Sequence, residues 1–285
     1  MRAVKFALVL SLGALALGCQ NDSKLDGAGG GGGGDLAARV KKLEESNAKY
    51  AEALEFLQKV YAQQKQQQVE QEQQEPDPNA MFAVDINQNM AGGYVQGPTT
   101  GAPVTIVVAE DFACPYCERV SGTLDELVKE YDGKIRVVFK NMVVHPQVTN
   151  AHYAGCAAGK QGKFQQWKTT WWEKAFKARK MDDANIDSIA KEIGLDMGKF
   201  KTDMTSDSCK QLVAADQAEL QKFKVNSTPT LFVNGTHVGG ALPKESFKQM
   251  IDEKLKIAQA SDYYDKVVMA TGEKQFRSKG QTKTN

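Results

Sequence analysis

The feature that most constrains this chain is a pair of cysteines placed between a predicted buried strand and a predicted helix. Residues 104–109 (VTIVVA) form a near-continuous β-branched apolar run, which is typical of a strand buried on both faces. Cys114 and Cys117 follow in the stretch DFACPYCERV, and the apolar spacing over residues 115–131 is helical. A second apolar run at 135–139 (IRVVF) completes a strand–helix–strand unit. The cysteine pair is therefore expected at the N-terminus of a helix.

Such a pair can be a redox centre, half of a metal site or a structural staple. A helix N-terminus carries about half a positive charge and several unpaired N–H groups, which together stabilise a thiolate. The first cysteine of a Cys-X-X-Cys motif is acidified in this position, and the second lies about one turn further along. We therefore assign Cys114 as the nucleophile and Cys117 as the resolving thiol.

The histidines of the chain do not favour a metal site. His145, His152 and His237 have no metal-ligand spacing with each other or with a cysteine. A closed zinc site usually has two closely spaced ligand pairs, and this chain has one such pair. We expect neither a metal nor another cofactor.

The N-terminal residues predict export. A short basic segment precedes an apolar run at 6–17, which is too short for a bilayer core that needs roughly 20 residues, so residues 1–18 are assigned to a signal peptide. The sequence Ala-Leu-Gly-Cys at its end resembles the lipobox of bacterial lipoproteins, which implies lipidation of Cys19. An ordinary signal peptide cut nearby is the alternative. Because Gln20 follows the cysteine, we favour the outer membrane over other sites in the periplasm or cell envelope.

Export also bears on the remaining cysteines. With Cys19 assigned to lipid, the CPYC pair and two further cysteines remain, and an even number in an oxidising compartment favours disulfides. Cys156 and Cys209 fall in the first and last helices of a segment with helical patterning at 148–223. A bridge between them would stabilise this segment, and two buried free thiols are the alternative.

A predicted stalk precedes the cysteine motif. Residues 19–34 contain the lipidation site and a Gly-rich flexible tether, and residues 35–75 follow as a helix with a heptad seam. Self-association through residues 36–61 is the favoured interpretation, as a dimer or a trimer, and packing on the chain's own globular domain is the alternative. Asn47 occupies an a position, where a buried amide sets register. The seam consists of Leu36, Val40, Leu43, Asn47, Tyr50, Leu54, Leu57 and Tyr61.

Composition and turn signals divide the rest of the chain. The net charge of +1 and the lack of a basic stripe give no indication of a nucleic-acid partner. Residues 76–100 are assigned to a linker, with a short strand at 82–86, and residues 101–265 to the globular domain. The tail, 266–285, is expected to be flexible.

Two separated motifs carry a resemblance to a known family. CPYC after a strand, together with STPTLFVNG at 227–235, resembles the bacterial DsbA-like thiol–disulfide oxidoreductases. The resemblance implies an α/β thioredoxin-like fold with a helical insertion, here preceded by an N-terminal coiled-coil helix. It also implies that Pro229 is a cis-proline lying against the cysteine pair, and that the backbone of Thr228 binds substrate. Pro115 and Tyr116, between the cysteines, are further candidate substrate-binding residues.

The resemblance has one departure and leaves the direction of the reaction open. Many relatives bury an acid six residues before the first cysteine, where this chain has Val108, and Glu110 or Asp111 could substitute. Thr228 and the CPYC dipeptide are more similar to the isomerase and copper-sensitivity-suppressor branches than to the oxidases. We expect a disulfide isomerase or reductase acting on cysteine-containing exported proteins, with a membrane redox partner. A dithiol oxidase and a Cu(I)-binding metal-tolerance protein are the alternatives.

Overall fold

The computed structural model describes residues 33–258 and 261–282. It divides into two compact units that meet between residues 64 and 65. The expected signal peptide at 1–18, Cys19 and most of the 19–34 tether lie outside the described residues. Among the residues described, no helix is both long and apolar enough to cross a lipid bilayer.

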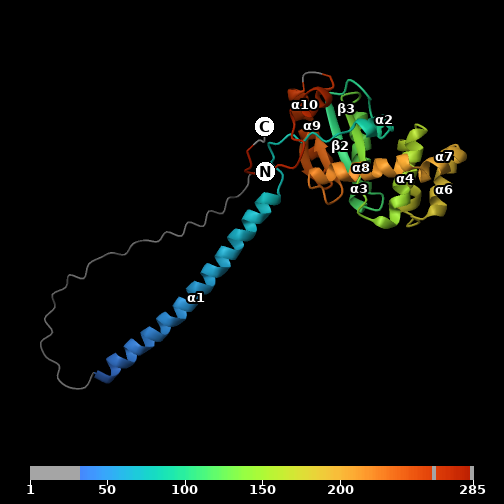
Figure 1. Ribbon diagram of the computed structural model, residues 1–285. Helices are drawn as coiled ribbons and strands as arrows, with labels where there is room; N and C mark the ends of the chain where they lie inside the picture. The colour runs from blue at the N-terminus through green and yellow to red at the C-terminus, as the bar shows by residue number, and fades with distance from the viewer. Residues whose placement is uncertain (1–32, 259–260, 283–285) are drawn as a thin grey trace. The chain divides into compact units, whose positions relative to one another are not determined.

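The first unit consists of one helix, α1 (Gly33–Gln74), whose last residues belong to the second unit. Figure 1 shows α1 as uninterrupted, so the glutamine-rich residues 63–74 at its C-terminal end are helical as well. The apolar seam side chains from Leu36 to Tyr61 are between 46% and 67% exposed. The stripe is thus exposed along the helix, and self-association through it stays a prediction.

The second unit is built on a five-stranded sheet in the order β1-β3-β2-β4-β5. β2 and β3 are parallel and every other neighbouring pair is antiparallel. Every residue of β2 and β3 is buried, which confirms the prediction from their apolar runs. The strands are β1 (Val95–Gln96), β2 (Val104–Glu110), β3 (Ile135–Asn141), β4 (Thr230–Val233) and β5 (Thr236–Gly239).

Helices surround this sheet, and five of them form the insertion expected between β3 and β4. In Figure 1 the insertion helices α4, α6 and α7 lie together, and α8 leads back from them to the sheet. The helices are α2 (Asn87–Ala91), α3 (Pro115–Glu130), α4 (Thr149–Lys160), α5 (Phe164–Trp171), α6 (Asp183–Glu192), α7 (Met197–Thr205), α8 (Asp207–Lys222), α9 (Lys244–Ile257) and α10 (Met269–Thr271), with shorter helical turns at Pro146–Val148, Trp172–Phe176 and Tyr264–Val268.

The core has two layers because side chains of β2 alternate between the faces of the sheet. Ile106 and Val108 pack with α3, α9 and the insertion. Val107 and Ala109 face the other way and pack with Phe82 and residues near the C-terminus. The strand that precedes the cysteine pair is thus fixed from both sides.

The second layer corrects two of the expected boundaries. Residues 76–100 are more than a linker, because Phe82 and its neighbours fill this face of the sheet; the strand expected at 82–86 is reduced to a single bridge between Phe82 and Glu273. The tail expected to be flexible from 266 is ordered as far as residue 282. Its Glu273 exchanges backbone hydrogen bonds with Met81 and Ala83, at 2.7 and 2.8 Å. An apolar sheet face needs a cover, and these two short segments supply part of it beside Leu220 and Phe223 at the end of α8.

A disulfide joins the two ends of the insertion. Cys156 on α4 and Cys209 on α8 are bridged, with Cα atoms 5.6 Å apart and 53 residues of sequence separation. The bridge holds together the first and last helices of the insertion.

We expect the Cys156→Ala/Cys209→Ala variant to be less stable, because the bridge restricts the unfolded chain. For a loop of this length the chain-entropy argument gives a loss of about 4 kcal/mol in the free energy of unfolding. Urea titration of the oxidised wild type and the variant measures it. Equal midpoints would show that the bridge does not stabilise the fold.

Candidate active site

Cys114 is the N-cap of α3, so its sulfur lies at the N-terminus of this helix. Its side chain is 5% exposed, and its Sγ lies 3.3 Å from the carbonyl oxygen of Thr228. The hydrogen bond from the Cys117 thiol is the main cause that lowers the pKa of Cys114 to about 5, against the opposing effect of burial. Thr228 and the amides of Tyr116 and Cys117 lower the pKa further. The sulfur is therefore a thiolate at neutral pH.

Cys117 has the opposite properties. It is fully buried, and both burial and the neighbouring Cys114 raise its pKa far above the ordinary value. The amide of Asp111 donates to its Sγ at 3.5 Å. Neither cysteine is in a disulfide. The Cys114 sulfur is thus activated for attack, while Cys117 stays a protonated thiol.

The peptide bond between Thr228 and Pro229 is cis, as the sequence predicted. It leads directly into β4, which pairs with β2, and β2 in turn leads to the cysteine motif. The pairing of these two strands brings residue 228 to Cys114 across 114 positions of sequence. Substrate binding by the Thr228 backbone stays a prediction.

The two residues between the cysteines lie at the surface. Pro115 and Tyr116 are exposed, and the Tyr116 ring, 55% exposed, has the Arg119 guanidinium 5.0 Å from its centroid. An exposed aromatic ring next to a nearly buried nucleophile suits contact with a substrate chain. Their role as substrate-binding residues remains a prediction.

A buried acid lies near the pair, at a position different from the usual one. Val108 is an apolar core residue, whereas Glu110 on the same face of β2 is a buried carboxyl. Burial raises the pKa of Glu110 to about 7, although Lys168 lowers it. Its charge also raises the pKa of Cys117. Glu110 therefore supplies the buried acid that Val108 cannot.

Lys168 is a site residue that the sequence did not single out. Its side chain is fully buried on α5, and its Nζ donates to Ser121 Oγ at 3.0 Å and to Asp125 Oδ1 at 3.1 Å. Ser121 and Asp125 follow Cys117 at four-residue intervals on α3, so this polar group lies on the helix face that carries the resolving thiol. A lysine within a tryptophan-rich helix was the available signal.

Asp111 is buried rather than being a solvated loop acid. Its carboxylate accepts hydrogen bonds from the amides of Ala113, Val144 and His145, and the Nδ1 atom of His145 lies 2.9 Å away. Burial acts to raise the pKa of Asp111, but the His152 ring and the amides of Ala113 and His145 hold it at about 2. The charged carboxylate therefore ties the cysteine loop to the segment that follows β3.

Comparison with known proteins places the chain in a family. The profile of the thioredoxin family matches residues 91–253. The chain belongs to this family, among its DsbA-like oxidoreductases. It is 31% identical over 192 residues to a probable disulfide bond formation protein D of Bacillus cereus, which covers 62% of this chain and 83% of that protein.

Two further proteins are similar to this DsbA-like chain over part of its length. A thioredoxin-like oxidoreductase from Silicibacter pomeroyi is 27% identical, with a TM-score of 0.52, and the match covers 57% of this chain and 91% of that one. The Na⁺/H⁺ antiporter NhaA of Herminiimonas arsenicoxydans is 29% identical over 148 residues, covering 52% of this chain. The chain spans 23% of the length of that antiporter, so the match concerns one part of it.

The described residues contain no group of three or more histidine, cysteine, aspartate or glutamate side chains that could hold a metal ion.

We expect alkylation of Cys114 to follow its thiolate. In reduced wild type the rate with iodoacetamide should rise to half its maximum near pH 5, where the pKa lies, and be level by pH 7. Cys117→Ala removes the main hydrogen-bond donor, so the midpoint should move to higher pH. The rates are measured by mass spectrometry of the labelled peptide. An unchanged midpoint in Cys117→Ala would contradict the assigned cause.

We expect Glu110 to make stability pH-dependent. Because its pKa is raised from 4.5 to about 7, its contribution is fully present below pH 4.5 and is lost as pH rises through about 7. Glu110→Gln, which stays neutral, should lack this decrease in the free energy of unfolding. Urea titrations from pH 4 to 8 measure the difference. Glu126→Gln, an exposed carboxylate of α3, is the control and should retain the wild-type profile.

Proposed function

We propose that this chain is an exported thiol–disulfide oxidoreductase that acts on cysteines of extracytoplasmic proteins. The observation that carries the proposal is the pairing of an acidic Cys114 with a buried, protonated Cys117 beside the cis peptide of Thr228. Each feature alone occurs in other settings, but together they supply an attacking sulfur, a resolving sulfur and an adjacent backbone edge.

The chemistry follows from this asymmetry. The Cys114 thiolate attacks one sulfur of a substrate disulfide, forms a mixed disulfide and releases the other sulfur as a thiolate. Cys117 then loses its proton and attacks Cys114 Sγ, which releases the reduced substrate and leaves the Cys114–Cys117 disulfide. The reverse sequence oxidises a substrate dithiol. In isomerisation a substrate thiolate resolves the mixed disulfide instead, and Cys114 is regenerated.

Isomerase or reductase is the favoured direction, and two features support it. The Thr228–Pro229 and CPYC pairs are similar to those of the isomerase branches, and an exposed apolar seam offers a way to bring two sites together. A dithiol oxidase is the second candidate. It is supported by the low pKa of Cys114, since a stabilised thiolate favours the reduced enzyme and makes its disulfide a stronger oxidant.

The proposed setting is the cell envelope. A signal peptide over residues 1–18 and lipidation of Cys19 would hold the chain at a membrane, with the outer membrane favoured. A membrane redox partner would reset the cysteine pair after each substrate. The proposed substrates are exported proteins that contain cysteines.

Self-association through α1 is part of the proposal. The seam from Leu36 to Tyr61 is exposed along its whole length, and its burial in a second or third copy would gain about 25 cal/mol per Å² of apolar surface. Asn47 would set the register. Two or more Cys114 sites could then engage one misoxidised substrate, which raises their effective concentration.

The test compares charges placed in and beside the seam. Leu54→Lys/Leu57→Lys should give a monomer, because both positions face the partner helix, whereas Phe56→Lys, an equally exposed apolar position outside the seam, should stay oligomeric. Sedimentation velocity measures the mass. The monomer should still catalyse insulin reduction through Cys114 but lose isomerisation of scrambled ribonuclease.

Three results would count against parts of the proposal. A monomeric wild type, or a monomeric variant that isomerises as well as the wild type, would make α1 a spacer. Dithiol oxidation without isomerisation would favour the oxidase. Background activity in every assay, with tight binding of Cu(I) by the reduced pair, would favour a metal-tolerance protein.

A further inference from the structure

A chain of buried polar side chains runs from the cysteine loop to the opposite side of β3. His152 Nδ1 lies 2.9 Å from Asn141 Oδ1, and Asn141 donates to Asp216 Oδ2 from its side chain at 2.7 Å and from its backbone at 2.9 Å. Asp216 Oδ1 forms an ion pair with Lys140 at 2.8 Å. No member is more than 4% exposed. These four residues are called the buried polar chain below.

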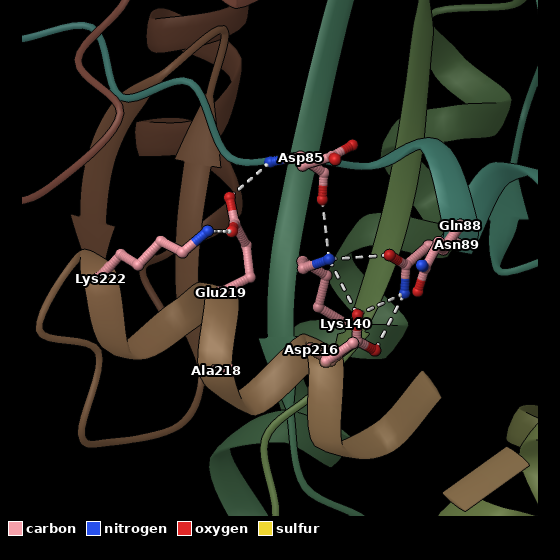
Figure 2. Close-up of a pocket in the computed structure, with 9 residues that line it drawn as sticks. Asp85, Gln88, Asn89, Lys140, Asp216, Ala218, Glu219 and Lys222 are labelled. Carbon is pink, nitrogen blue, oxygen red and sulfur yellow. Dashed lines mark hydrogen bonds and ion pairs between the residues drawn. The ribbon is translucent and has the colours of Figure 1, made fainter. Parts of the chain in front are cut away.

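The far end of the chain is fully satisfied. Lys140 lines a cavity of about 270 Å³. Figure 2 shows its Nζ bonded to Asp216, to the Asn89 side chain and to the carbonyl of Asp85. All three donors of the ammonium group are used, so the ion pair does not require a ligand. A buried ion pair is weak evidence for stability in itself, because desolvation offsets its attraction. The Lys140–Asp216 ion pair instead holds Asp216 in place at one end of the buried polar chain.

The near end of the chain points at the catalytic loop. Because the Asn141 amide donates to Asp216, its Oδ1 is left to accept, so the Nδ1 atom of His152 must donate. The chain thereby fixes the orientation of the His152 ring, whose Nε2 has no hydrogen-bond partner and lies 3.9 Å from Asp111 Oδ2. The backbone amide of Asp111 donates to Cys117 Sγ.

We propose that His152, Asn141 and Asp216 are positioning residues that set the reactivity of the cysteine pair through Asp111. The proposal rests on the proposed function, since it concerns how the same pair is tuned. His152 and Asp216 come from α4 and α8, the two insertion helices joined by the disulfide. The insertion therefore acts on the active site indirectly: its side chains orient the residues next to the cysteine pair, as outer residues orient the ligands of a metal site.

The first test uses two acid-to-amide substitutions on α8. Asp216 and Glu219 both line the cavity, but only Asp216 is bonded to Asn141, since Glu219 contacts Lys222 and the Asp85 amide. Asp216→Asn should change the equilibrium constant between the Cys114–Cys117 disulfide and glutathione by at least about twofold, the lower range for coupled groups. It should also move the midpoint of Cys114 thiolate absorbance at 240 nm. Glu219→Gln should leave both at wild-type values.

The second test keeps the proposal decidable if Asp216→Asn does not fold. His152→Leu removes the bond to Asn141, whereas His152→Asn can still donate to it, so the leucine variant should show the shift and the asparagine variant should recover most of the wild-type equilibrium constant. The double variant His152→Leu/Asp216→Asn should shift the equilibrium constant little more than either single variant does, because both substitutions interrupt the same buried polar chain.

The proposal is overturned if folded His152→Leu keeps the wild-type equilibrium constant and thiolate titration, or if His152→Asn shifts them as much as leucine does. Thermal melts establish which variants are folded. These readouts need no protein substrate. A wild type that is inactive on insulin would therefore refute the proposed function while leaving the effect of the buried polar chain measurable.

Discussion

The structure depends on the contact between Cys114 at the start of α3 and the backbone of Thr228 before β4. In this contact the Cys114 thiol donates to the Thr228 carbonyl oxygen. When the thiol ionises, the Cys117 thiol and the amides at the helix N-terminus stabilise the thiolate. The contact exists because β2 and β4 pair antiparallel, which places the end of one strand beside the start of the other. The sheet is fixed from both faces, so the sulfur and the carbonyl stay in register. The sheet and its packing thereby hold Cys114 Sγ close to the Thr228 carbonyl oxygen.

Much of the fold could be predicted from the sequence because its signals are local. Continuous apolar runs at 104–109 and 135–139 predicted two buried strands. The cover of the second sheet face could not be predicted in the same way. The strand predicted at 82–86 is only a single bridge between Phe82 and Glu273, and Phe82 packs on an apolar face of the sheet that distant parts of the chain create.

The site divides along the same line. Cys114, Cys117 and Pro229 were predictable because a motif and a turn identify each of them without knowledge of the fold. Lys168 and Asp216 were not, because each is a polar residue in a helix and each becomes buried through a partner 47 or 75 positions away. Such long-range pairing leaves no periodic signal in the sequence. The reacting residues can thus be predicted from local sequence motifs, whereas the residues that adjust their reactivity are brought together only in the folded protein.

The paired ends of the second unit have a consequence for how the chain matures. Glu273 and Arg277 reach back to Ala83 and Asp77, so the segment around Phe82 is completed by residues that are synthesised long after it. Until the chain reaches this region, the apolar face formed by Val107 and Ala109 lacks Tyr264 and Val268, even though the cysteine motif has long been synthesised. Closure of the sheet therefore waits until Tyr264 and Val268 have been made. A chain cut before Tyr264 would keep every catalytic side chain and still lack a finished core.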